Sequence, residues 1–445
     1  MNCLWKFAKE NHISFGTHKC AVVMIDPNTP AEPDELEEKR AEVSQNASQL
    51  APPQFVWKLG DRVMEVRKSY KYLGIEETFN DDYSEFLTRK KKEVIVKLLD
   101  VQKVGGRRGG LNPIDLRKLY FTLIRPKIEF GLTQLPYNDV NINALENLQY
   151  KCLRQLFGFL PSTKKETMLV LCGIPSIRMR MATLKLAFAN KIINMKNGFY
   201  VKEIMKTNWN SSSGLGNDLR NLQTDWSSDP DIDQLCANLI QNQIGCDKHT
   251  TFKSKLKISF ERCDFERCKR ALYESVGRSG QTFLVSAMIS NRTTHSLSQQ
   301  LRVSISRSRM ALFTNVLSGC DFLTPYNHAK KPKCKFCGAN DVHWVHILFE
   351  CTETPNHHRF FCSYLASLQT DDPVKVARFT KLKRLLSRLW NQKELPELFK
   401  IMMGVGLETY DLCYQELVDV LVATTAEKLS HVDSGWSSLD RDIDG

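Results

Sequence analysis

Four residues in the C-terminal third of the chain have types and spacings suited to binding one metal ion. Two residues separate Cys334 from Cys337, eight separate Cys337 from His346, and four separate His346 from Cys351. A Cys-x2-Cys pair can direct both sulfurs at one ion, and the His–Cys pair supplies the other two corners of a tetrahedron. So small a module has little core of its own and folds because metal binding contributes the missing free energy. The spacing predicts a structural Zn²⁺ site at these four residues.

Other assignments of these ligands stay open. The four residues could instead be buried thiols beside an unrelated histidine, and His343 lies three residues before His346. His346 is the preferred ligand because the apolar residues 347–349 can pack beneath the site. A less favoured ligand set combines Cys351 with His357, His358 and Cys362.

The overall composition indicates a multidomain protein that meets a polyanion. At 445 residues the chain has room for two or three domains, and its 62 Lys and Arg against 50 Asp and Glu give a net charge of +12. No apolar run reaches the roughly 18 residues of a membrane span, and the first residues lack the pattern of a secretory signal. Fourteen scattered cysteines, three of them needed as ligands, favour a reducing compartment, which means nucleus or cytoplasm.

The positive charge is concentrated in two zones. Residues 89–127 hold twelve Lys and Arg against three acids, and residues 271–340 hold nine against two, whereas residues 31–42 carry six acids and two bases. Such zones suit contacts with phosphates, although a charged run is often only a solvated surface. The candidate nucleic-acid contacts are Arg107, Arg108, Arg125, Lys127, Arg302, Arg307, Arg309, Lys330, Lys331, Lys333 and Lys335.

Periodicity predicts a mainly α chain with a small antiparallel β-sheet near the N-terminus, an α+β class, and a separate zinc knuckle near the C-terminus. Residues 20–25 and 55–75 alternate like strands, and apolar spacings of three and four follow from residue 84 onward. Asn112 and Pro113 predict the start of a helix, and the stripe Ile142, Leu145, Leu148, Cys152 and Leu156 predicts a buried helix face. Further helices are expected at 84–105, 176–196, 379–390 and 407–429, with only short helical pieces over 233–318.

Composition shifts suggest six segments. They are a sheet-bearing segment 1–83 with an acidic insertion at 26–54, a helical domain 84–207, a linker 208–232, a basic helical region 233–330, the zinc knuckle 331–365 and C-terminal helices 366–445.

Several of these pieces, in this order, resemble the distal half of a non-LTR (LINE-type) retrotransposon reverse transcriptase. The Trp5–Cys20 stretch looks like the family's Trp-bearing segment before a strand, and Tyr70-Lys-Tyr-Leu-Gly-Ile75 resembles the hairpin that ends the palm. The thumb motifs of the family are similar to Leu119–Gly131, Leu145–Arg154 and Cys172–Arg178 followed by Leu184-Lys185. The family places a Cys-Cys-His-Cys zinc motif where the predicted knuckle lies. The resemblance covers about residues 1–200 and 300–360.

The resemblance implies a distal palm, a thumb and a zinc knuckle that bind RNA and DNA as template–primer or target DNA, without a membrane. In the family, the aromatic-x-Asp-Asp motif that binds catalytic Mg²⁺ precedes the segment that here begins at Trp5. We therefore expect no catalytic residues in this chain, and Mg²⁺ only if a catalytic half is supplied elsewhere. Phe79-Asn-Asp81-Asp82 looks like that motif but follows the palm hairpin, so a helix N-cap is the favoured interpretation.

Three interpretations remain open. The favoured one is a nucleic-acid-binding part of a reverse transcriptase that is inactive by itself. The second is an RNA-directed DNA polymerase completed by an upstream or partner segment, and the third is a domesticated adaptor that binds protein through the knuckle and the C-terminal helices.

Overall fold

The computed structural model describes most of the helical part of the chain. The described residues are 83–105, 111–161, 163–196, 198–207, 214–240, 249–276, 292–302, 372–405, 407–412 and 414–426, with short pieces elsewhere that include six strands and residues 346–351. The chain divides into two compact units, residues 1–93 and 94–445. The described residues are mainly helical, which confirms the predicted predominance of helix. No helix among them is long and apolar enough to cross a membrane.

The strands of the first unit form separate pairs. β1 (Ala21–Val22) runs parallel to β4 (Glu65–Val66), β2 (Lys58–Leu59) pairs antiparallel with β3 (Arg62–Val63), and β5 (Ser69–Tyr72) pairs antiparallel with β6 (Ile75–Thr78). The single small antiparallel sheet expected from residues 20–25 and 55–75 is not present among the described residues. The acidic insertion 26–54 and the Asp81-Asp82 pair lie outside them.

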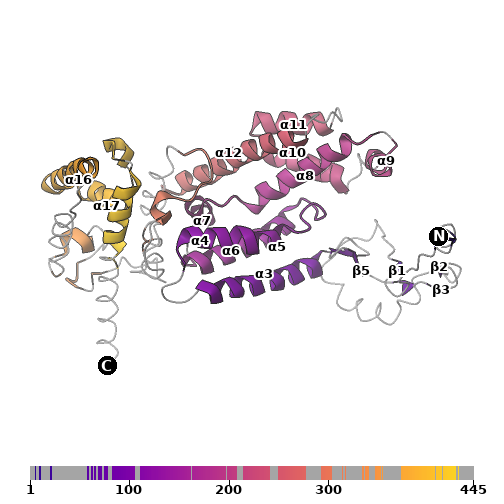
Figure 1. Ribbon diagram of the computed structural model, residues 1–445, viewed down its shortest axis with the longest axis horizontal. Coiled ribbons are helices and arrows are strands. Elements are labelled where there is room, and N and C mark those ends of the chain that lie inside the picture. Colours follow the sequence, from indigo (N-terminus) through magenta and orange to yellow (C-terminus); the bar gives the residue numbers. More distant parts are fainter. Residues whose placement is uncertain are drawn as a thin grey trace, which may run out of the picture. The chain divides into compact units, whose positions relative to one another are not determined.

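The second unit begins within α3 (Ser84–Gly105) and continues as a bundle of helices (Figure 1). The bundle contains α6 (Asp139–Phe157), α7 (Lys165–Cys172), α8 (Ile177–Ile193), α9 (Tyr200–Thr207), α10 (Gly214–Trp226), α11 (Pro230–Ile240) and α12 (His249–Val276). The predicted stripe of α6 is buried, because its spacings of three and four place it on one face. α12 packs along α7 and α8, so the described residues of the predicted domain 84–207 and α12, from the predicted basic region 233–330, belong to one bundle.

A helix interrupted by proline joins α3 to this bundle. It comprises α4 (Pro113–Leu119), a π-helical turn η2 (Tyr120–Ile124) and α5 (Arg125–Glu129). Asn112 caps α4 as predicted, because its Oδ1 accepts a hydrogen bond from the Asp115 N–H at 2.9 Å. Pro126 lacks an N–H and its ring crowds the preceding turn. The chain accommodates it by widening that turn, and the Arg125 N–H donates to the Tyr120 carbonyl five residues back.

The predicted linker 208–232 is wrong over most of its described length. Residues 214–226 form α10, and Leu219, Leu222 and Trp226 are buried. Asp218 holds this helix in place: it binds Lys185 Nζ at 2.6 Å and accepts the Tyr137 N–H at 2.7 Å. The Gly, Asn and Asp content suggested a loop, but these tertiary contacts outweigh the weak helix propensity.

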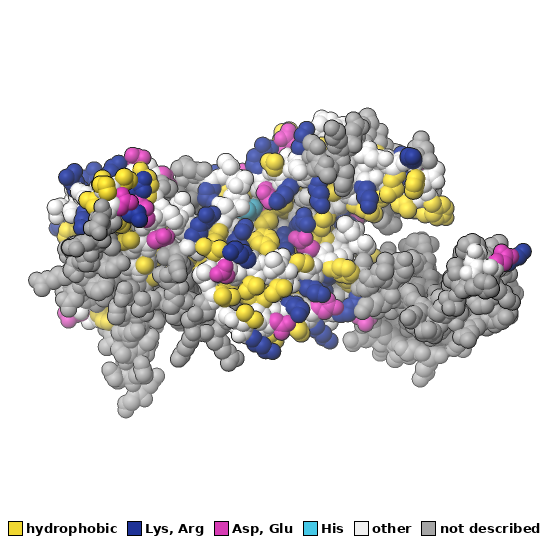
Figure 2. All heavy atoms as spheres, in the orientation of Figure 1, with side chains coloured by type: hydrophobic (Ala, Val, Ile, Leu, Met, Phe, Trp, Pro, Cys, Tyr) yellow, Lys and Arg dark blue, Asp and Glu magenta, His cyan; other side chains and the backbone are white. Residues whose placement is uncertain are grey.

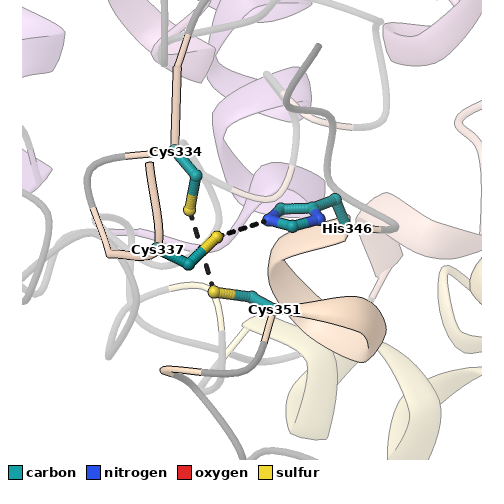
Figure 3. Close-up of side chains that lie close together, drawn as sticks. All are labelled: Cys334, Cys337, His346 and Cys351. Atoms are coloured by element: carbon teal, nitrogen blue, oxygen red, sulfur yellow. Dashed lines mark hydrogen bonds between the residues drawn. The ribbon is translucent and has the colours of Figure 1, made fainter. Parts of the chain in front are cut away.

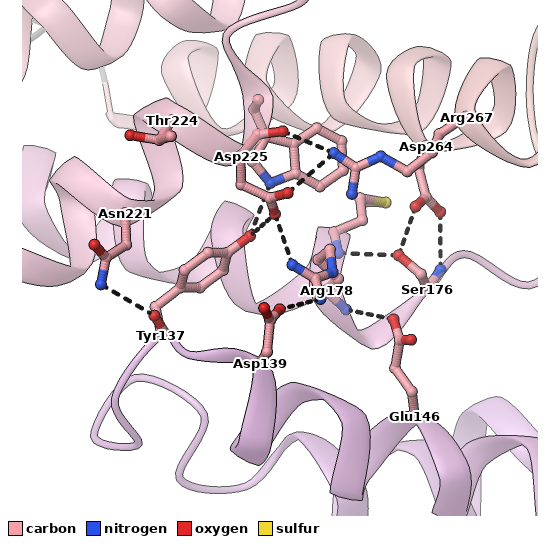
Figure 4. A network of polar contacts seen from close by, with 12 residues as sticks. Tyr137, Asp139, Glu146, Ser176, Arg178, Asn221, Thr224, Asp225, Asp264 and Arg267 are labelled. Carbon is pink, nitrogen blue, oxygen red and sulfur yellow. Dashed lines mark hydrogen bonds and ion pairs between the residues drawn. The ribbon is translucent and has the colours of Figure 1, made fainter.

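A polar network joins α10 to α8 and α12 (Figure 4). The Asp225 carboxylate accepts hydrogen bonds from the Tyr137 hydroxyl at 2.6 Å and from Arg178 at 3.0 Å. Arg267 of α12 donates to the Asp225 carbonyl at 2.8 Å, and its guanidinium lies 4.3 Å from the centroid of the Trp226 ring. Because every donor has an acceptor, these half-buried charges fix the angle between the helices at little desolvation cost.

Asp264 lies at the centre of a second network, which we call the Asp264 cluster and which contains Asp264, Ser176 and His295. The Asp264 carboxylate accepts hydrogen bonds from the Ser176 N–H at 2.9 Å and the Ser176 hydroxyl at 2.5 Å, and it lies 3.0 Å from His295 Nε2. The side chains of Asp264 and His295 are 2% and 1% exposed. The cluster therefore binds α12 to the start of α8 and to residues 292–302.

Residues 292–302 lie against the bundle at a glycine. The Ser298 N–H donates to the Leu171 carbonyl at 3.0 Å, and Gly173 ends α7 with φ +62°. A Cβ at Gly173 would lie 2.1 Å from the Ser296 carbonyl carbon. Both the left-handed backbone and the close approach require glycine at this position.

The same segment reaches a C-terminal group of helices. This group contains α16 (Pro373–Asn391), α17 (Leu395–Met402), the short turn η5 (Leu407–Tyr410) and a helix over residues 415–426. Gln300, in η3 (Gln299–Arg302), donates to the Gly404 carbonyl, and Gln415 donates to the Gln299 carbonyl at 3.2 Å. The core of the group is apolar and is made by Leu382, Leu386, Leu389, Phe399, Ile401, Met402, Leu417, Val418, Leu421 and Val422.

Asp264→Asn should destabilise the protein by about 2–3 kcal/mol, because it removes the charge that accepts several buried hydrogen bonds. Chemical unfolding followed by circular dichroism measures the change. Asp231→Asn is the matched control, since Asp231 is 67% exposed and its ion pair with Arg262 contributes little. Equal unfolding free energies for the two variants would contradict a central role for the cluster.

The contribution of Asp264 should depend on pH. Burial raises the pKa of its carboxyl, but the hydrogen bonds and charge of His295 and the hydrogen bonds of Ser176 outweigh burial and lower the pKa below its ordinary value of 3.8. A folded-state pKa below the unfolded one stabilises the protein above the unfolded value and loses this effect as the pH falls through the folded value. The difference in unfolding free energy between wild type and Asp264→Asn should therefore hold its full size above about pH 5 and shrink in more acidic buffer. A difference that grows on acidification would contradict this.

Candidate metal centre

A tight turn presents the first two cysteines. The Gly338 N–H donates to the Cys334 carbonyl at 2.7 Å, and the Cys334 N–H donates to the Ala339 carbonyl at 2.8 Å. Gly338 has φ +74°, a left-handed conformation that glycine adopts without strain. Closing the chain in this way turns both sulfurs toward the same side, as Cys334 and Cys337 show in Figure 3.

A single π-helical turn presents the other two residues. It is η4 (His346–Glu350), and it ends with the Cys351 N–H donating to the His346 carbonyl at 2.8 Å. The five-residue repeat of a π turn places His346 and Cys351 nearly above one another. Leu348 within the turn is buried, in agreement with the apolar packing expected beneath the site. The side chains of residues 347 and 349 lie outside the described part.

The four side chains converge on one point (Figure 3). All four ligand atoms lie within 4.8 Å of one another. The Cys334 and Cys351 sulfurs are 3.8 Å apart, and the Cys337 sulfur is 3.4 Å from His346 Nε2. The sulfur separation is far longer than the roughly 2.05 Å of a disulfide, and all three cysteines are free. The cluster could hold a metal ion, as the spacing of these residues predicted.

The histidine is oriented for ligation through one nitrogen. Nε2 faces the Cys337 sulfur, while Nδ1 lies 3.8 Å from Glu350 Oε2. A carboxylate beside the outer nitrogen of a ligating histidine favours the tautomer that leaves the inner nitrogen free to bind the ion. Glu350 is thus a carboxylate near the outer nitrogen of His346, and the sequence did not single it out.

The two cysteines of the turn differ in acidity. The pKa of Cys337 is lowered, chiefly by a hydrogen bond from the backbone of Ala339. Burial raises the pKa of Cys334 to about 11. Cys337 is therefore the readier thiolate, and an ion would have to displace the proton of Cys334 when it binds.

A second group of possible ligands contains Asp264, Cys268 and His295. Cys268 is a free thiol, and folding places His295 close to it although the two residues are far apart in the sequence. Burial raises the pKa of Cys268 well above its ordinary value, and the Asp264 oxygens are already taken by Ser176 and His295. A neutral thiol and an occupied carboxylate fit a structural role, which the Asp264 cluster already explains.

The structure describes only some of the predicted nucleic-acid contacts, and it contradicts one of them. Arg125 is a correction: it is 3% exposed, binds Glu129 at 2.7 Å and donates to the Pro175 carbonyl at 2.9 Å, so it cannot reach a phosphate in this fold. Lys127, Arg302 and Lys333 are exposed. The remaining predicted contacts lie outside the described residues: Arg107, Arg108, Arg307, Arg309, Lys330, Lys331 and Lys335.

The three motifs that resemble a reverse transcriptase thumb meet around one turn of the chain. Pro175 lies in the third motif, and its carbonyl accepts hydrogen bonds from Arg125 of the first and from Gln149 of the second, the latter at 3.1 Å. Glu129 of the first motif binds Arg180 at 2.9 Å, just beyond the third. These residues therefore hold α5, α6 and α8 together rather than presenting a surface.

Comparison with known proteins adds no relative: no family model, no curated protein and no solved structure matches the chain.

Purified protein should contain one metal ion per chain, measured by plasma mass spectrometry after dialysis. Cys337→Ser and Cys351→Ser should each lose that ion, because three ligands hold it far less tightly than four. Cys263→Ser is the control, because Cys263 is a half-buried free thiol that donates to Asp229 at 2.6 Å, a bond that serine can also make. Metal-free wild-type protein, or equal metal content in all variants, would contradict the site.

Proposed function

We propose that this chain binds nucleic acid as the distal part of a LINE-type reverse transcriptase, with a zinc knuckle beside a thumb-like helical bundle. The observation that carries the proposal is the convergence of three cysteines and one histidine on one point. A structural module of this ligand set belongs among small nucleic-acid-binding elements. The order of the thumb motifs, and their meeting around Pro175, are the further support.

Zinc is the metal that suits this ligand set best. Three thiolates and one imidazole are soft and borderline ligands, which favour Zn²⁺ over Mg²⁺ or Ca²⁺. With a Zn–S bond of about 2.3 Å, a tetrahedron places two sulfurs about 3.8 Å apart. The Cys334–Cys351 separation of 3.8 Å agrees with that geometry. All four corners would be filled by protein, so the ion would hold the knuckle together and leave no position for a substrate.

Exposed lysines on α3, α5 and α6 are the described groups best placed to hold a phosphate backbone. Gln102 of α3 donates to Gln155 of α6 at 3.3 Å, so the two helices lie side by side. Lys103 follows this contact on α3, and Lys151 precedes it by one turn on α6; both are exposed. With Lys127 of α5 they replace Arg125 in the proposed footprint. Lysines act here as point charges, which bind the backbone without reading sequence.

Binding of the full chain to a short RNA–DNA duplex should weaken steeply with salt. Each phosphate contact contributes about 0.9 to the slope of log affinity against log salt concentration. The triple change of Lys103, Lys127 and Lys151 to Gln should therefore reduce that slope by about two to three. Fluorescence anisotropy at several salt concentrations measures it.

The control for this experiment removes the same charge elsewhere. Lys253, Lys255 and Lys257 are exposed on α12, at positions outside both basic zones of the sequence. Changing these three to Gln should alter the slope by less than one. Salt-independent binding by the wild type, or an equal effect of the two triple variants, would overturn the proposed footprint.

A further inference from the structure

The positive charge of the C-terminal group of helices is concentrated on α16. Residues 372–426 contain eight Lys and Arg and seven Asp and Glu, so the segment is close to neutral. Six of the eight cations lie in α16, which contains no acid. Figure 2 shows the Lys and Arg side chains gathered over this helix, at the left of the view. The positive charge is therefore concentrated on one helix, although the segment as a whole is close to neutral.

One face of α16 holds the apolar core and the other holds the charge. Leu382, Leu385, Leu386 and Leu389 are at most 7% exposed. Lys381, Arg384 and Arg388 are exposed, and their spacing of three and four residues places them in one row. We call these three residues the α16 row. The leucines of α16 are already buried within the protein and are not available to insert into a lipid bilayer. The large apolar side chains that α16 exposes, Val374 and Val376, lie in its first turn and outside the row.

The α16 row is only weakly neutralised by its neighbours. The acid that faces it is Asp411, 3.4 Å from Lys381, and this pair is 53% and 91% exposed, so it contributes little and can open. Among the described residues, no acid pairs with Arg384 or Arg388, and the Arg388 guanidinium lies 5.7 Å from the centroid of the Tyr410 ring. The better neutralised cation of α16 is Arg378, which binds Glu416 at 2.6 Å outside the row.

The dimensions of the row fit a nucleic-acid backbone. Lys381 and Arg388 are seven residues apart, which is about 10 Å along the helix axis. Phosphates on one strand of a duplex advance about 3.4 Å per nucleotide, so the row spans about three of them. The two aromatic rings of α16, Phe379 and Trp390, are half-buried, whereas stacking of unpaired bases uses exposed rings. A partner held by its phosphates alone is therefore favoured.

We infer that the α16 row is a second docking surface for the phosphate backbone of a nucleic-acid duplex, separate from the metal cluster and from the lysines of α3, α5 and α6. It rests on the proposed function only in that both name nucleic acid as the partner. Its contacts are sequence-independent, because phosphates carry no sequence information. The row lengthens the nucleic-acid footprint. Its roughly three phosphate contacts make the slope of log affinity against log salt concentration steeper.

The test compares the full-length wild type with Lys381→Gln, Arg384→Gln and Arg388→Gln combined. The variant should retain the metal content and thermal unfolding of the wild type, because all three side chains are exposed. Its salt slope for duplex binding should fall by about two to three, which is a several-fold to tenfold loss of affinity near physiological salt. The Lys253, Lys255 and Lys257 triple variant is the charge-matched control.

The outcomes separate this inference from the proposed function. Unchanged duplex binding by the α16 variant, with the wild type still binding, overturns the α16 row alone. Failure of the wild type to bind any duplex overturns both. Loss of binding to phosphatidylserine vesicles, with duplex binding unchanged, assigns the row to a lipid surface and overturns it as a nucleic-acid site. A reduced slope for the α16 variant with an intact slope for the control supports it.

Discussion

The buried carboxylate of Asp264 is the interaction on which the arrangement of the second unit depends. It accepts both donors of Ser176 at the start of α8 and lies within hydrogen-bonding distance of His295, so three stretches of chain far apart in sequence meet at one charge. A buried charge is tolerated only while its partners stay in place. The segment held by His295 then contacts the C-terminal helices through Gln300 and Gly404.

The metal cluster, by contrast, is built from residues that are close together in the sequence. Its parts are local: one turn and one π-helical turn bring the four residues together within eighteen positions. Spacing along the chain alone was therefore enough to predict which residues converge. Glu350 could not be singled out from the sequence, because one acid four residues after a histidine has no distinctive spacing. Only the structure shows that its carboxylate lies near the outer nitrogen of the imidazole.

Where the partner lies far along the chain, sequence patterns were a poorer guide. Asn112, Pro113 and the stripe of α6 were predictable because caps and periodicity depend on neighbours. Arg125 was assigned to phosphate because it lies in the basic zone 89–127, yet the backbone of Pro175, fifty residues away, accepts a hydrogen bond from its guanidinium. Residues 214–226 were assigned to a linker for their composition, although Leu219, Leu222 and Trp226 have helical spacing and Lys185 supplies the missing partner of Asp218.

The residues that carry the resemblance also need a different physical interpretation. Arg125, Glu129 and Gln149 bind other parts of the bundle, so the cations and polar groups of these motifs serve to join helices. The cations proposed to hold a ligand are exposed lysines, of which Lys127 and Lys151 lie within these motifs, and the row on α16, which lies in none of them.

The central claim is that this chain holds nucleic acid by its backbone, at the knuckle and on basic helix faces. Ultraviolet crosslinking of the full-length protein to an RNA–DNA duplex, with the crosslinked peptides identified by mass spectrometry, tests it most directly. The account predicts crosslinked peptides from residues 334–351, from α3 to α6 and from α16. Crosslinks confined to α12, or none at a salt concentration at which other polyanion-binding proteins are captured, would contradict it.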